Sequence, residues 1–296
     1  MSAARETATP TLGFVGLGRM GGNMAARLLD AGYAVHGETR SRARAQHLID
    51  AGLRWCETPR QVAEAADILF TSIPDDAALE DVASGPDGVL AGLVPGKIWM
   101  ELSTVSPGAS RELAERVRER GAAMLDAPVS GSVPQVQAGT LTIMVGGDEE
   151  AYRRAEPVLR ELGTPTRIGD NGQGLTLKLA INLSLAVQML SLSEGVLMGE
   201  RDGIDRGLAL DVMTSSAIGS PTLKARAPFM LELPDEAWFD VRLMRKDVRL
   251  ALEEADRLHV SAPSGRAALN ALTLAGTLGY DHRDIAALFE VLEQTS

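Results

Sequence analysis

Lys178 and Asn182 are the residues of this sequence whose types and spacing point most directly to chemistry. They lie four positions apart in the segment 172–195, so a helix would place the amine and the amide on one face. Lys178 is the one charged residue between Asp170 and Glu194. An amine in apolar surroundings needs a partner or a task, and desolvation favours its neutral form. We therefore predict that Lys178 is the catalytic centre and that Asn182 is its catalytic partner.

The surrounding segment, 172–195, predicts a long helix buried on most sides, because apolar residues occupy nearly every face. A run of about 20 apolar residues can also cross a membrane. Polar residues interrupt this run at Lys178, Asn182, Ser184, Gln188 and Ser191. We therefore expect a core helix and no membrane partner.

A dinucleotide site is indicated upstream by a glycine pattern between a strand and a helix. The apolar run Thr11–Val15 precedes GLGRMG, and a predicted helix runs from Met20 to Leu29. Gly16 permits the tight turn, Gly18 lets the backbone approach a pyrophosphate, and Gly21 lets the helix pack against the strand. The predicted cofactor contacts of this turn are Gly16, Leu17, Gly18, Arg19, Met20 and Gly21.

The end of the second predicted strand, Ala34–Gly37, bears on the choice of dinucleotide. An acidic residue there would accept the ribose hydroxyls of NAD, whereas an arginine can clasp the extra phosphate of NADP. Uncharged Thr39 and then Arg40 and Ser41 follow Glu38. We predict NADP as the preferred cofactor, bound by Thr39, Arg40 and Ser41. NAD stays the alternative because the Glu38 carboxylate could reach the ribose.

Strands and helices then alternate, which predicts an α/β Rossmann-type doubly wound parallel sheet. Such sheets bind ligands beyond the carboxyl ends of their strands. Ile73 and Pro74 follow one strand, and Ser103 and Thr104 follow the next. They are predicted cofactor contacts, with polar turn residues as the equally weighted alternative. The predicted strands are 68–72, 97–102, 124–126 and 141–145, and the predicted helices are 76–83, 107–120 and 149–162.

The stretch from Asp126 to Gly139 carries no charge in its interior and is rich in proline and glycine, which predicts an irregular backbone. Ser130, Gly131 and Ser132 offer hydroxyls and N–H groups close together, a combination suited to a substrate carboxylate. An ordinary loop is the alternative. We predict a small carboxylate-bearing substrate bound by these three residues.

The second half shows only helical periods, so we predict an all-α domain joined to the first by the long helix. The predicted division is a loose leader at 1–10, an NADP-binding domain at 11–169 and a helical substrate and dimerisation domain at 170–296. The predicted helices are 208–213, 221–230, 246–259, 264–278 and 284–292. An apolar helical half favours a homodimer or a higher even homo-oligomer.

Composition excludes several other functions. A net charge of −11 argues against a nucleic-acid partner. The single cysteine, Cys56, excludes an intramolecular disulfide and fits a reducing compartment, so we expect a cytoplasmic protein. No His/Cys/Asp group has zinc spacing, so no metal is predicted.

Five motifs together resemble the β-hydroxyacid dehydrogenase family, which includes 3-hydroxyisobutyrate dehydrogenase and the tartronate and glyoxylate/succinic semialdehyde reductases. The likeness covers about residues 11–292. Its motifs are GFVGLGRMGGNMA at 13–25, ELSTVSP at 101–107, DAPVSGSVPQVQAGTLTIMVGG at 126–147, GQGLTLKLAIN at 172–182 and KDVRLALEEA at 246–255.

The resemblance implies a role for each motif. The glycine turn would bind the dinucleotide, Arg40 its 2′-phosphate, and Ser103 and Thr104 would lie near the nicotinamide. Ser130 and Gly131 would take the substrate carboxylate. Lys178 would be the general acid/base for the alcohol proton, Asn182 would help to hold substrate, and Lys246 would lie near the cofactor. Without the resemblance, Lys246 reads as an exposed lysine in the first turn of a helix.

The implied activity is the interconversion of a small 3-hydroxy acid and its semialdehyde or ketone with NAD(P). Ser132 replaces a glycine of many members, and Ile181 replaces the histidine of the 6-phosphogluconate branch. Imine reductases of related fold usually lack the lysine, so Lys178 argues against imine reduction, the alternative within enzymes. A non-catalytic NADP-binding module is the alternative outside them.

Overall fold

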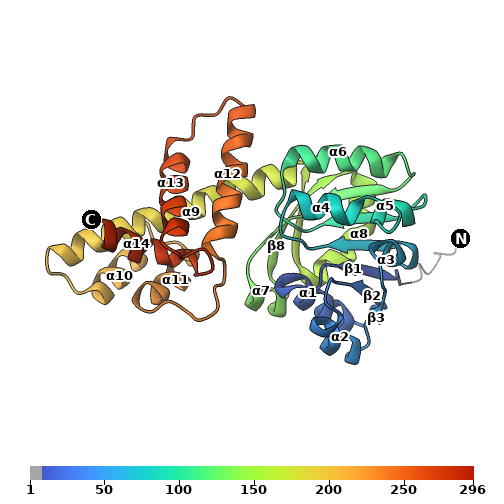
Figure 1. Cartoon of the computed structure of the whole chain (residues 1–296), viewed down its shortest axis with the longest axis horizontal. Helices are drawn as coiled ribbons and strands as arrows, with labels where there is room; N and C mark the ends of the chain where they lie inside the picture. The colour runs from blue at the N-terminus through green and yellow to red at the C-terminus, as the bar shows by residue number, and fades with distance from the viewer. Residues whose placement is uncertain (1–8) are drawn as a thin grey trace, which may run out of the picture. The chain divides into compact units, whose positions relative to one another are not determined.

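A computed structural model describes residues 9–296 of the chain (Figure 1). Contacts divide the chain into two compact units, the first ending at Lys178 and the second comprising Leu179–Ser296. The predicted leader, residues 1–10, lies outside the described residues except for Thr9 and Pro10. Each unit contains a hydrophobic core of its own.

The first unit is built on one sheet with the order β3-β2-β1-β4-β5-β6-β8-β7, and β9 pairs with β8. The neighbours from β3 to β6 all pair in parallel, which confirms the predicted Rossmann-type fold. Beyond β6 the sheet continues differently, because β8 runs antiparallel to both β6 and β7. The strands are β1 Leu12–Val15, β2 Val35–Glu38, β3 Arg54–Trp55, β4 Ile68–Thr71, β5 Ile98–Glu101, β6 Ala123–Asp126, β7 Val129–Ser130, β8 Leu141–Gly147 and β9 Gly163–Gly169.

Helices connect these strands, and α4 and α8 have the predicted bounds. Ser106 begins α6 and Asp148 begins α8, each accepting a hydrogen bond from a first-turn N–H with its side chain. The helices of this unit are α1 Arg19–Asp30, η1 Arg42–Ala45, α2 Gln46–Asp50, α3 Pro59–Ala65, α4 Asp76–Ala83, α5 Val89–Gly92, α6 Pro107–Arg118, α7 Val133–Ala138 and α8 Glu149–Leu162.

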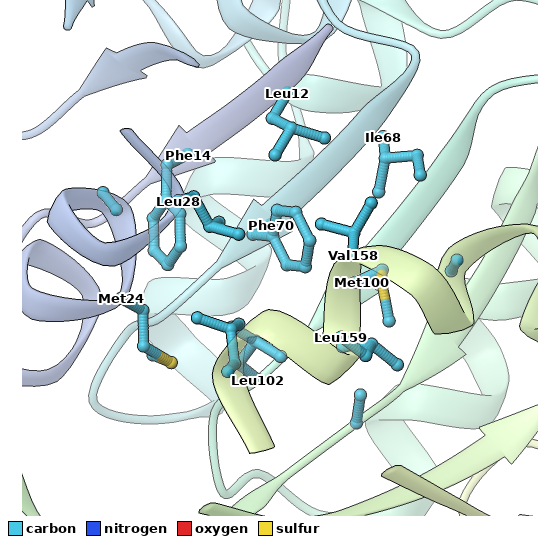
Figure 2. Close-up of a cluster of buried hydrophobic side chains, with 14 of the residues drawn as sticks. Leu12, Phe14, Met24, Leu28, Ile68, Phe70, Met100, Leu102, Val158 and Leu159 are labelled. Carbon is cyan, nitrogen blue, oxygen red and sulfur yellow. The ribbon is translucent and has the colours of Figure 1, made fainter. Parts of the chain in front are cut away.

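The core beneath the dinucleotide turn joins the central strands to α1 and α8. Figure 2 shows Phe14 and Phe70, from β1 and β4, between Met24 of α1 and Val158 of α8. The two rings stack with their centroids 5.7 Å apart. Burying a side chain of this size stabilises the fold by about 1.5–3 kcal/mol, so this layer holds the carboxyl ends of the strands in place.

The connection from Asp126 to Gly139 is more regular than predicted, because it contains β7 and α7. The side-chain oxygen of Gln135 accepts hydrogen bonds from both the N–H and the hydroxyl of Ser132, each at 2.9 Å. The helix ends at Gly139, whose φ of +66° is the left-handed conformation that glycine favours. The predicted irregular backbone is thus interrupted by a short strand and a helix, and the spacing of Ser132 and Gln135 is a helix-start signal.

Helix α9 (Gln173–Arg201) is one continuous helix of 29 residues, and the division between the two units falls within it. Its most apolar 18-residue stretch passes the length and hydropathy test for a membrane span, a test that core helices also pass. Only 44% of that stretch is buried. The prediction of burial on most sides of 172–195 was therefore too strong, since Leu177 is exposed and Leu185 and Val187 are only partly buried.

The second unit is helical, with a single isolated β-bridge between Asp240 and Asp284 among its described residues. The buried Asp284 carboxylate accepts hydrogen bonds from the N–H groups of Trp238 and Phe239, and the Arg226 guanidinium lies 3.5 Å from it. These contacts fix the connection between two helices. The helices after α9 are α10 Arg206–Ser215, α11 Pro221–Leu231, α12 Val241–Arg257, α13 Pro263–Thr277, η2 Ile285–Ala287 and α14 Leu288–Thr295.

His259 gives a prediction about stability. It follows the end of α12 with a φ of +58°, and it is the one non-glycine residue with positive φ in residues 9–296. We expect His259→Gly to raise the free energy of unfolding by about 0.5–1 kcal/mol, because glycine adopts this conformation without steric cost. Thermal denaturation measures the change. His47→Gly, within α2, is the control and should lower the stability; an equal loss in both variants would contradict the prediction.

Candidate functional site

The glycine turn after β1 has the geometry of an anion site. Gly16 has a φ of +90°, and a Cβ there would lie 2.3 Å from the Ser72 carbonyl oxygen. A Cβ on Gly18, by contrast, would meet nothing within 4 Å, so the space in front of this residue is open. Gly18 is also the N-cap of α1, with no capping side chain and no acidic residue in the first turn. A helix N-terminus with this open approach suits a pyrophosphate.

The end of β2 brings Glu38, Thr39, Arg40 and Ser41 to the outer side of this turn. Glu38 is the last residue of β2 and is partly buried, while Arg40 and Ser41 are exposed. Burial raises the pKa of Glu38, and the nearby Arg40 charge opposes that shift. Arg42 differs from Arg40, because it lies 3.5 Å from Glu57 and over the Trp55 ring. Arg40 is the better placed of the two for a phosphate.

The loops after β4 and β5 are joined by a hydrogen bond. The Ser103 hydroxyl accepts a 2.7 Å bond from the N–H of Ile73, so two predicted cofactor contacts thirty residues apart lie together. They lie on the other side of β1 from Arg40, as the order β2-β1-β4-β5 requires. Thr104 is partly buried and Pro74 is exposed.

Glu101, a residue that the sequence reasoning did not single out, supports these loops. Its fully buried carboxylate accepts hydrogen bonds from the Thr71 hydroxyl and the Ser103 N–H. The Trp99 indole in turn donates a 2.9 Å bond to Thr71. A charged residue inside an apolar strand was the signal that could have found it.

The predicted carboxylate site follows β6. Ser130 is in β7, partly buried, and pairs with Thr142 of β8. Gly131 is exposed, with a φ of +134°. Ser132 begins α7 and donates its hydroxyl to Gln135, so its side chain already has a structural partner. Of the three predicted residues, Ser132 takes part in starting α7, whereas Ser130 and Gly131 lie before that helix.

Lys178 is buried, with an exposed fraction of 8%, and lies in the second turn of α9. Its burial follows from its apolar neighbours on α9, because Leu175 and Leu179 on either side of it are buried. A lysine this buried is rare in proteins unless it has a partner or a function. The structure therefore keeps the predicted amine away from bulk water.

Asn182 follows one turn later on α9 and is 2% exposed. Its amide nitrogen donates a 2.6 Å hydrogen bond to Asp247, whose other oxygen lies 3.0 Å from the Lys246 ammonium. A carboxylate only accepts, so it fixes which end of the amide faces it and leaves the carbonyl oxygen for another donor. Asp247 is a residue that the site prediction omitted.

Lys246 is placed differently from its reading as an exposed first-turn lysine. Helix α12 begins at Val241, so Lys246 lies in its second turn, and its side chain is 16% exposed. That reading was wrong because Asp240, which accepts a hydrogen bond from the N–H of Leu243, starts the helix earlier than the apolar period suggested. Among the described residues, no group of three or more His, Cys, Asp or Glu side chains could hold a metal ion.

Family models match almost the whole described chain. Residues 11–172 match the NAD-binding domain of 6-phosphogluconate dehydrogenase. Residues 172–292 match the NAD-binding domain of NADP-dependent 3-hydroxyisobutyrate dehydrogenase. The first match alone extends over more than half of the sequence.

Individual relatives agree with the models. The chain is 34% identical to 2-(hydroxymethyl)glutarate dehydrogenase of Eubacterium barkeri, over 96% of this chain and 95% of the relative. It is 34% identical to 2-hydroxy-3-oxopropionate reductase of Escherichia coli, over 95% and 97% of the two chains. The solved structure of Psf3 in complex with NADP+ and 2-OPP has a TM-score of 0.86 and 29% identity, over 95% of this chain and 100% of that one. The chain therefore belongs to the β-hydroxyacid dehydrogenase family of NAD(P)-dependent oxidoreductases.

Proposed function

We propose that this protein interconverts a small 3-hydroxy acid and its semialdehyde with NADP, and that Lys178 is the general acid/base. The observation that carries the proposal is the buried Lys178 one helical turn before the buried Asn182, whose amide is fixed by Asp247. Burial near a reacting group is the usual means by which proteins prepare a lysine for proton transfer.

In the oxidation direction, Lys178 in its neutral form takes the hydroxyl proton onto Nζ while the C–O bond becomes a carbonyl. When bound, the dinucleotide would supply the hydride acceptor for this oxidation. In the reduction direction, the Lys178 ammonium returns that proton to the carbonyl oxygen. The second N–H of the Asn182 amide group donates to the substrate oxygen and orients it, so that the hydroxyl proton faces Lys178. Ser130 and the Gly131 N–H bind the carboxylate.

The division of labour follows the sequence prediction. Residues 11–169 bind NADP through the turn 16–21, the stretch 39–41 and the loops 73–74 and 103–104, and residues 170–296 contribute to substrate binding and dimerisation. The open space at Gly18 and the position of this glycine at the N-terminus of α1 support the pyrophosphate contact. Lys246, held beside Asp247, lies near the cofactor in this proposal.

A substrate panel tests the activity. Glyoxylate, succinic semialdehyde, tartronate semialdehyde and methylmalonate semialdehyde are each offered with NADPH or NADH, and the absorbance of the reduced nicotinamide is followed. We expect turnover of at least one semialdehyde with NADPH preferred. Cyclic imines are offered in parallel, and turnover of imines alone would overturn the proposal. Cofactor binding with no turnover of any compound would instead favour the non-catalytic module.

Arg40 gives a prediction about cofactor choice. We expect Arg40→Ser to raise the KM for NADPH roughly 10- to 100-fold and to leave that for NADH nearly unchanged, because a charge-assisted bond to the 2′-phosphate contributes about 1.5–3 kcal/mol. Steady-state kinetics with both cofactors measure the change. Arg42→Ser is the matched control, since Arg42 already pairs with Glu57. Equal effects of the two substitutions on NADPH would contradict the assignment.

We also propose that the protein is a cytoplasmic homodimer or a higher even homo-oligomer. Support for assembly comes from large apolar side chains exposed on α9, on α10 and between α10 and the end of α11. These side chains are Met198, Leu208, Val212, Ile218 and Leu231. Sedimentation at micromolar concentration tests the assembly, and a monomer at that concentration would contradict it.

A further inference from the structure

Asp126 is a buried carboxylate outside every role considered so far. It is the last residue of β6, fully buried, and its backbone is held in the sheet between Glu101 of β5 and Gly146 of β8. Paired on both sides, this residue cannot move without disturbing the sheet. Its side chain therefore projects from a fixed point.

The carboxylate of Asp126 binds the beginning of α9. One oxygen accepts a 2.7 Å hydrogen bond from the N–H of Gly172, and the other accepts a 3.0 Å bond from the N–H of Leu175. These N–H groups belong to the helix start, where no partner within the helix exists and where the helix dipole favours a negative charge. Burial raises the pKa of Asp126, and the hydrogen bonds from these two N–H groups offset part of that rise.

The surrounding backbone packs closely around the Asp126 carboxylate, so that a side chain on the neighbouring glycines would not fit. A Cβ on Gly146 would lie 2.7 Å from both carboxylate oxygens, and a Cβ on Gly174 would lie 2.9 Å from one of them. Asn171 adds a 2.8 Å bond to the carbonyl of Met124, two residues before Asp126. The carboxylate therefore sits in a closely fitted position at the helix start.

We infer that Asp126 is a positioning residue, which fixes the position of Lys178 relative to the loop that carries Ser130 and Gly131. Leu175, which it holds, lies three residues before Lys178 and hence on the same side of α9 one turn earlier. The chain that leaves Asp126 in the other direction reaches Ser130 four residues later. One carboxylate thus ties the lysine helix to the loop that carries Ser130 and Gly131. The inference rests on the proposed role of Lys178.

Asp126→Asn tests the inference at nearly constant size. The amide can accept from only one of the two N–H groups and turns its own NH₂ toward the other. We expect hydrogen exchange of the amides in 172–178 to become roughly tenfold faster, since the helix start loses its cap. We expect kcat with the best semialdehyde to fall roughly 10- to 100-fold, because small displacements of a reacting group are costly. NADPH affinity should stay within about twofold of wild type, because the cofactor contacts are elsewhere.

Asp148→Asn is the matched control. Asp148 caps its own helix, α8, through a single 2.8 Å bond from the N–H of Ala151, and α8 carries no proposed site residue. Asparagine can keep that one bond, so this variant should leave kcat and the exchange of 172–178 at their wild-type values. An Asp126→Asn protein with unchanged exchange in 172–178, or with faster exchange and unchanged kcat, would overturn the inference. Wild-type protein that turns over no compound of the panel contradicts the proposed function instead, and the exchange measurement then still decides whether Asp126 holds α9.

Discussion

Lys178→Met is expected to lower kcat for the preferred semialdehyde by about 10²- to 10⁴-fold, the range for loss of a general acid/base. Methionine has a similar length and is apolar, so it fits a position that is only 8% exposed. Removing a buried amine should leave the stability unchanged or higher, because its desolvation is no longer opposed to folding. The affinity for NADPH, measured by its fluorescence, should not change.

The control for this variant is Lys224→Met, which removes an exposed lysine from α11. It should leave kcat at the wild-type value. The two variants together separate loss of a reacting group from loss of one positive charge. A Lys178→Met protein that reduces semialdehydes at the wild-type rate would exclude Lys178 as the proton carrier.

The second large effect is expected at Gly18. Its backbone angles, φ −74° and ψ −163°, are accessible to alanine, and an added Cβ meets no atom within 4 Å. Gly18→Ala should therefore fold normally. The methyl group would nevertheless stand where the pyrophosphate approaches the helix start, so we expect the Kd for NADPH to rise about 10- to 100-fold through weakened charge-assisted bonds.

Gly16→Ala is the comparison variant, and we expect it to affect stability more than cofactor binding. A left-handed alanine costs about 1–2 kcal/mol, and the clash with the Ser72 carbonyl adds to that cost. This protein should lose stability in thermal denaturation before any effect on binding is considered. Gly18→Ala protein that binds NADPH as tightly as wild type would show that the dinucleotide does not approach the turn.

The parts of the fold that could be predicted were those that depend on residues close together in the sequence. The strand Leu12–Val15, the glycine turn and α1 follow from neighbouring residues, and so do α4 and α8, whose caps lie beside them in sequence. Helix α7 was missed although Ser132 and Gln135 gave a local signal. The antiparallel return of β8 had no such signal, because the connection through β7 and α7 decides its direction.

The residues of the candidate site could likewise be predicted only where their partners are close in the sequence. Lys178 and Asn182 could be predicted because one helix holds both at a readable spacing. Asp247 and Asp126 could not be identified in this way, since they bind groups 65 and 46 or more residues away along the chain. Such partners become neighbours only when the fold is formed. Local periodicity carries no information about them.

The unbroken α9 has a consequence for the kinds of sequence change that this protein can accept. Each residue of an α-helix advances about 1.5 Å and turns about 100°. One residue inserted between Leu175 and Lys178 would leave the first turn on the Asp126 carboxylate and rotate the lysine away from its present direction. A deletion there would rotate it the other way. We therefore expect this short stretch to tolerate many replacements of side chains and no change in length.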